Sequence, residues 1–93
     1  MLHAHHFRYY LATEARMTFG SVNSTTARVR RVEKATDTDV ETLLDQAGVD
    51  PLVARIDAGD AAFASQNADA LANCRAAVRR YHEFRQWRLA QQP

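Results

Sequence analysis

Residues 71–84 read LANCRAAVRRYHEF, and this stretch has the clearest periodicity of the chain. Its apolar side chains recur every three or four residues, which is the spacing that places them on one face of an α-helix. The pattern predicts a long C-terminal helix over about 69–90 that is buried along this face. The predicted buried face holds Leu71, Cys74, Ala77, Val78, Tyr81 and Phe84.

A second helix is predicted from Thr18, whose hydroxyl can cap it, to about Lys34. At 100° per residue, its apolar and β-branched side chains fall within one arc and its arginines fall on the opposite one. The inner arc holds Val22, Thr25, Thr26, Val29 and Val32. The outer arc holds Asn23, Ala27, Arg30, Arg31 and Lys34. Before this helix, Phe7, Tyr10 and Leu11 have the spacing of the buried stripe of another helix over about 4–16.

The middle of the chain carries helix-capping signals. Thr38 and Glu41 match a capping box, and Gly48 stands where a left-handed C-cap belongs. Asp50-Pro51 predicts an N-cap followed by a proline at the first position of another short helix, which ends near Gly59. Residues 60–68 are then expected to form a loop that is anchored by Phe63.

These segments predict an all-α fold, a small orthogonal bundle of four to five helices. Residues 1–93 form one domain in this interpretation, with 1–3 and 91–93 frayed. A composition with 46% apolar residues, three glycines and two prolines fits a helical globular chain. The single cysteine cannot form an internal disulfide, and no apolar run approaches the roughly 18 residues that span a bilayer. No signal peptide is recognisable, so we expect a cytoplasmic protein without membrane contact.

The charged residues divide the chain into three parts. Residues 1–36 hold six Lys/Arg and two Asp/Glu, residues 37–69 hold one and eight, and residues 70–93 hold five and one. The formal net charge of +1 therefore conceals two basic segments that could meet a polyanion. The candidate phosphate-binding residues are Arg28, Arg30, Arg31 and Lys34 in the first segment and Arg75, Arg79 and Arg80 in the second. The alternative is that these side chains are solvated or pair with the acidic middle of the chain.

Trp87 falls on the polar side of the last helix, two turns beyond Arg80. A tryptophan in that position can stack on a base or anchor a partner protein. The alternative, which is the more common one, is that it folds back over the N-terminal helix as peripheral core.

Neither a metal site nor a catalytic site is predicted. His3, His5 and His6 cluster near the N-terminus, but the lone Cys74 is far away in sequence and lies on an apolar stripe. The chain has no Gly-rich phosphate loop, nucleophile elbow or CxxC pair, and its carboxylates near helix ends are explained by capping. We therefore expect no cofactor and no enzymatic activity.

The order of these features resembles a known helical module. The features are Phe7 to Leu11, the stretch from Thr18 to Glu33, Leu43-Leu44, and the AVRRYHEF ending of residues 77–84. They are similar to the N-terminal SAM-like, core-binding domain of tyrosine recombinases (phage integrases). Similar helical modules precede nuclease domains in restriction and mobile-element proteins. The resemblance implies a domain that clamps duplex DNA and leaves catalysis to a separate nuclease or recombinase domain.

Two functions are therefore expected from the sequence. The first is a non-enzymatic helical DNA-binding accessory module that contacts the phosphates of duplex DNA through its arginine-rich faces. The second is a protein-interaction or homodimerisation module in which acidic and basic faces of neighbouring molecules meet, with Trp87 and Tyr9 in the contact.

Overall fold

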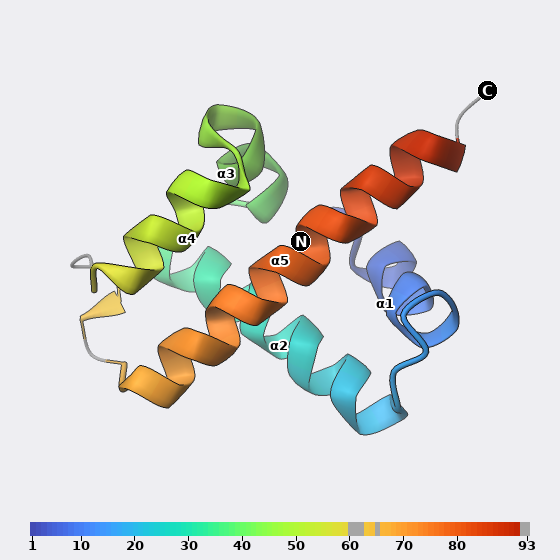
Figure 1. Cartoon of the computed structure of the whole chain (residues 1–93), viewed down its shortest axis with the longest axis horizontal. Helices are drawn as coiled ribbons and strands as arrows, with labels where there is room; N and C mark the ends of the chain where they lie inside the picture. The colour runs from blue at the N-terminus through green and yellow to red at the C-terminus, as the bar shows by residue number, and fades with distance from the viewer. Residues whose placement is uncertain (60–62, 65, 92–93) are drawn as a thin grey trace.

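The computed structural model describes residues 1–59, 63–64 and 66–91, which form an all-α bundle without strands (Figure 1). In chain order the helices are α1 (Ala4–Thr13), α2 (Phe19–Thr36), α3 (Val40–Ala47), α4 (Val49–Asp57) and α5 (Ala68–Gln91). The predicted helical bundle is therefore confirmed. Its shortest extent is 18 Å, which corresponds to about two helix diameters.

The long helix α5 is the central element of the fold. It crosses α2 and packs against it, with α3 and α4 on one side and α1 on the other (Figure 1). The predicted inner residues of α5 are buried except Leu71, which is half-buried. Phe7 of α1 lies 4.9 Å from Tyr81 and 5.4 Å from Phe84 between ring centroids. Full burial of each such ring stabilises the fold by about 1.5–3 kcal/mol, so this cluster holds α1 against α5.

The two arcs predicted for α2 are confirmed. All five residues of its inner arc are buried, and all five of its outer arc are exposed. Thr26 can be buried because its hydroxyl donates a hydrogen bond to the carbonyl of Val22 at 2.7 Å. Thr18 caps the helix as predicted, since its side chain accepts a hydrogen bond from the backbone N–H of Ser21.

The predicted capping box at Thr38 is wrong by one residue. Asp39 is the N-cap of α3, and its carboxylate accepts a hydrogen bond from the N–H of Glu41 at 2.8 Å. The Thr38 hydroxyl instead donates to the carbonyl of Thr36. Glu41 does not reach back to the cap because its carboxylate is bound by side chains of α5.

The start of α4 also differs from the prediction. Gly48 rather than Asp50 is the N-cap, so Pro51 occupies the third position of the helix rather than the first. Proline is tolerated there because the N–H groups of the first helical turn have no partner within the helix. Gly48 has φ 87° and ψ 178°, a positive φ but not the left-handed helical conformation that we expected. Gly59, at φ 63°, follows the end of α4 as predicted.

The predicted loop over 60–68 and the C-terminal end that was expected to fray lie only partly within the described residues. Phe63 is fully buried, as expected for an anchor, whereas residues 60–62 and 65 of the predicted loop lie outside the described part. Residues 1–3 were expected to fray, yet the terminal ammonium of Met1 lies 3.3 Å from a carboxylate oxygen of Glu33. Gln91 belongs to α5, and residues 92–93 lie outside the described part.

Candidate nucleic-acid interface

The outer face of α2 carries the first set of predicted phosphate-binding residues. Arg30, Arg31 and Lys34 are exposed, and Arg28 on the flank is half-buried. Within the described part of the chain, none of these four side chains forms an ion pair or a hydrogen bond. Their charges are therefore available to an anionic ligand.

Glu33 is the only carboxylate within α2, and it forms no ion pair with these cations. One of its oxygens accepts a hydrogen bond from the N–H of Val40 at 2.9 Å, and the other lies 3.3 Å from the Met1 ammonium. Its side chain is only 12% exposed. Lys34 is the least favourable of the four cations, because it borders a depression that the carboxylates of Glu33, Asp37 and Asp39 also line.

The second predicted set, on α5, has a different environment. Arg75 lies 2.9 Å from a carboxylate oxygen of Asp57 in α4, and Arg80 lies 3.2 Å from Glu83 in its own helix. Only Arg79 of this set is exposed and without an ion pair in the described residues. The seven candidates thus do not form two equal basic faces, and α5 contributes one unpaired cation.

The surroundings of Cys74 reflect the packing of α2 against α5. Burial raises the pKa of the Cys74 thiol, and the charges of Arg31 and Arg28 partly oppose this shift. These two arginines therefore lie near the first half of α5. Cys74 itself is fully buried with its sulfur 3.7 Å from the side-chain oxygen of Gln66. A buried thiol with a raised pKa is a poor nucleophile, in agreement with its predicted inner position.

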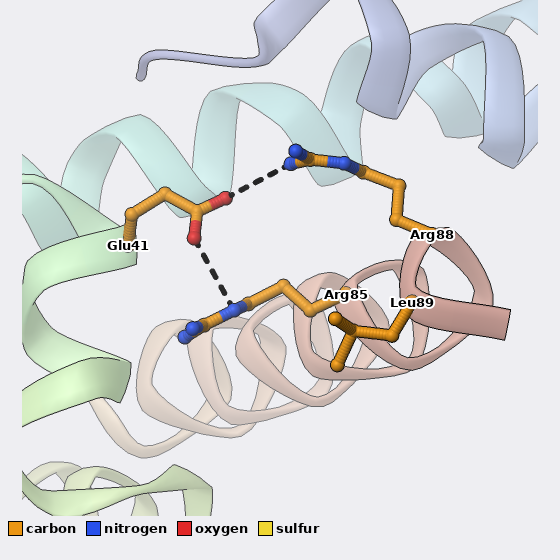
Figure 2. A pocket seen from close by; sticks show the side chains of 4 residues that line it. All are labelled: Glu41, Arg85, Arg88 and Leu89. Atoms are coloured by element: carbon orange, nitrogen blue, oxygen red, sulfur yellow. Dashed lines mark ion pairs between the residues drawn. The ribbon is translucent and has the colours of Figure 1, made fainter. Parts of the chain in front are cut away.

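Two arginines that were not predicted as site residues hold α5 against α3 (Figure 2). Arg85 lies 3.2 Å and Arg88 lies 3.5 Å from opposite oxygens of Glu41, whose side chain is 15% exposed. Arg85 also pairs with Asp45. The Tyr81 hydroxyl donates a 2.5 Å hydrogen bond to Glu41, and burial together with this carboxylate raises the pKa of Tyr81. The arrangement is internally satisfied, so it is a structural ion-pair network with no free cation for a ligand.

The position of Trp87 agrees with the alternative interpretation. Its ring lies 5.3 Å from Tyr10 and 5.7 Å from His6 of α1 between centroids, and it is half-buried. Trp87 therefore extends the core over α1 and presents only part of its surface to a partner. The large exposed apolar residues lie elsewhere and include Phe19, at 77% exposure, and Tyr9, at 58%.

The three N-terminal histidines lie in different environments. His3 approaches Glu41 at 3.9 Å, His6 packs on the rings of Phe84 and Trp87, and His5 is exposed. Among the described residues, no group of three His, Cys, Asp or Glu side chains is placed to hold a metal ion.

Comparisons with protein-family models, curated proteins and solved structures find no match to this chain. The resemblance to the helical domain of tyrosine recombinases therefore stays a prediction. None of the helices described is both long and apolar enough to cross a bilayer.

Proposed function

We propose that this chain binds DNA through the outer face of α2 and catalyses no reaction itself. The observation that supports this proposal is a set of four cations on one helix that form no ion pair with any described residue, Arg28, Arg30, Arg31 and Lys34. Arginine matches phosphate well, because its planar guanidinium can donate two parallel hydrogen bonds to phosphate oxygens.

The shape of α2 favours a close approach to a phosphate backbone. Ala27 and Ser24 lie exposed beside the arginines, so small side chains separate the cations. From Arg28 to Lys34 the helix rises by about 9 Å, a distance over which duplex DNA carries roughly five phosphate charges. The four cations of α2 offer about four phosphate contacts, which predicts a slope of log K against log salt near −4.

Phosphate contacts position a protein on DNA but do not read its sequence. We therefore propose an accessory role in the cytoplasm, beside a nuclease or recombinase domain that carries the chemistry. The resemblance of this chain to the helical domain of tyrosine recombinases agrees with that role.

A second candidate is a protein-interaction or homodimerisation module. It is favoured by the exposure of Phe19 and Tyr9, since large apolar side chains on a surface often mark a contact. Charge complementarity supports it less, because Asp45 and Asp57 already pair with arginines of α5. Trp87, which we expected in such a contact, packs on α1 instead.

Fluorescence anisotropy of a labelled duplex at low and moderate salt tests the proposal. We expect salt-sensitive binding by a monomer, and weaker binding when Arg30 and Arg31 are both replaced by alanine. The matched control replaces the paired Arg75 and Arg80 by glutamine, which leaves the α2 face intact. Unchanged binding by the Arg30/Arg31 variant would show that this face is only solvated. Light scattering that shows concentration-dependent dimers indifferent to DNA would favour the second candidate.

A further inference from the structure

We infer that the cationic face of α2 ends in an aromatic platform for an unpaired base. The preferred ligand is then DNA with a single-stranded end rather than a continuous duplex. This inference rests on the proposed function, because it assigns the nucleic-acid structure that the same surface recognises.

The platform is an open hollow of about 340 Å³ between α1 and the first turn of α2. Its apolar lining consists of Tyr9, Ala12, Phe19 and Val22. Phe19 and Tyr9 are the two large rings at its surface, and neither takes part in a ring contact with another described residue. Their faces are therefore available for stacking, which every base can accept because each has a π-face.

The hollow is aligned with the cations of α2. At 100° per residue, Phe19, Arg30 and Lys34 fall within about 60° of one another around the helix axis. Arg30 lies eleven residues after Phe19, which corresponds to a rise of about 17 Å. A strand whose phosphates contact Arg30 can thus continue along the same stripe and place a base at Phe19. Aromatic side chains next to a cationic track are the usual arrangement in proteins that bind single strands.

The polar residues around the hollow favour an anion. The other lining residues are His5 and Arg8, so the lining contains no carboxylate. The guanidinium of Arg8 donates a 2.6 Å hydrogen bond to the side-chain oxygen of Asn23, which fixes this cation between the aromatic platform and the arginines of α2. A nucleotide, with a flat base and a negative phosphate, complements this combination.

The same charges argue against a second copy of the chain as the occupant. In a twofold dimer each patch meets the equivalent patch of its partner. Arg8 and the α2 cations would then approach like charges, without a carboxylate in the hollow to offset the repulsion.

The test compares three labelled DNAs of equal duplex length, which are blunt, with a 3′ overhang and with a 5′ overhang. A 2-aminopurine in the overhang reports stacking directly through its fluorescence. We expect one overhang to bind about tenfold more tightly than the blunt duplex, within the range that base–aromatic stacking contributes. We also expect its 2-aminopurine signal to be quenched.

The decisive variant replaces Phe19 and Tyr9 by alanine. It should remove the preference for the overhang and the quenching while it leaves the affinity for the blunt duplex unchanged. Leu89→Ala is the matched control, because it removes another exposed apolar side chain, 65% exposed, from a different helix. Phe19→Trp should retain the preference, since it keeps a ring at this position.

The outcomes separate the inference from the proposed function. Equal binding of all three DNAs by the parent protein, or an overhang preference that survives the Phe19/Tyr9 variant, overturns the inference alone. If the parent protein binds none of the three DNAs, both the inference and the proposed function are overturned. A change in light scattering caused by the Phe19/Tyr9 substitutions, with DNA binding unaffected, assigns the hollow to a protein contact instead.

Discussion

The helices α2 and α5 are both rich in arginine, yet the fold gives them different roles. On α5, Arg75, Arg80, Arg85 and Arg88 all face carboxylates at ion-pair distance. On α2, none of the four cations does so within the described residues. The comparison teaches that the charge of a surface depends on which elements pack beside a helix as well as on the composition of that helix.

The difference follows from the arrangement of the acidic middle of the chain. The helices α3 and α4 supply Glu41, Asp45 and Asp57, and both lie along one side of α5 (Figure 1). The outer face of α2 is turned away from these helices, since its inner face packs on the bundle. Arg75, Arg85 and Arg88 of α5 therefore join it to its neighbouring helices, whereas the arginines of α2 have no such partner among the described residues.

The largest effect is expected from Tyr81→Ala in α5. The substitution removes a fully buried ring and the hydrogen bond to Glu41, and it should lower the free energy of unfolding by about 3–5 kcal/mol. Urea denaturation followed by circular dichroism measures this change. Arg31→Ala in α2 is the comparison and should change stability by less than about 0.5 kcal/mol. Similar losses in both variants would remove the distinction between the two helices.

The next effect is expected from Glu41→Gln in α3. It removes the negative charge that pairs with both Arg85 and Arg88. The substitution should lower the free energy of unfolding by about 2–3 kcal/mol. This loss is smaller than that for a fully buried ion pair, because the Glu41 site is partly solvated. Asp45→Asn is the matched control at a 65% exposed side chain and should cost less than about 1 kcal/mol. Chemical denaturation of both variants compares their losses in free energy of unfolding. A Glu41 variant as stable as the control would mean that the ion pairs of Glu41 with Arg85 and Arg88 contribute little to stability.

A smaller, pH-dependent effect is expected at Asp39. Burial by itself would raise the pKa of this carboxyl, but the hydrogen bond that it accepts from the N–H of Glu41, together with the nearby Met1 ammonium, lowers the pKa overall. The folded state then holds its proton less tightly than the unfolded state. The resulting stabilisation is present above the ordinary pKa of about 4 and is lost as the pH falls through the lower folded value.

Asp39→Asn tests this contribution, because asparagine also caps helices but does not ionise. Thermal unfolding between pH 2 and 6 should show a weaker acid destabilisation in the variant than in the parent protein. An identical pH profile would exclude Asp39 as a source of acid sensitivity.

The smallest change in stability is expected from Phe19→Ala, at less than about 0.5 kcal/mol. Phe19 is 77% exposed and is absent from the core, so its removal leaves the packing intact. Differential scanning calorimetry measures the change in melting temperature. A large loss would mean that Phe19 supports the fold and is not free for a ligand.

Local periodicity explains how much of the fold was predictable. The inner and outer arcs of α2 and the buried face of α5 depend only on residues within one helix, so their spacing predicts them. The cap of α3 was missed because Thr38 and Asp39 are adjacent and both can cap a helix. The choice between them depends on Glu41, which side chains of α5 draw away from the cap.

The candidate site was predictable to a different extent. The exposure of Arg30, Arg31 and Lys34 follows from helical phase alone. Helical phase does not predict that these cations have no carboxylate partner among the described residues. That outcome depends on the contacts of Glu33 with Met1 and Val40, which are distant in sequence or lie in another helix. The pairing of Arg85 with Asp45 joins residues 40 positions apart, and no local pattern specifies such a contact.

The salt dependence of duplex binding tests the central claim most directly. We predict a slope of log K against log salt near −4 for the parent protein, reduced in magnitude by about 2.7 when Arg30, Arg31 and Lys34 are replaced by alanine. The Arg75→Gln/Arg80→Gln variant of α5 should keep the parent slope. Equal slopes for the parent and the α2 variant, or an equal reduction in the α5 variant, would contradict the assignment of DNA binding to α2.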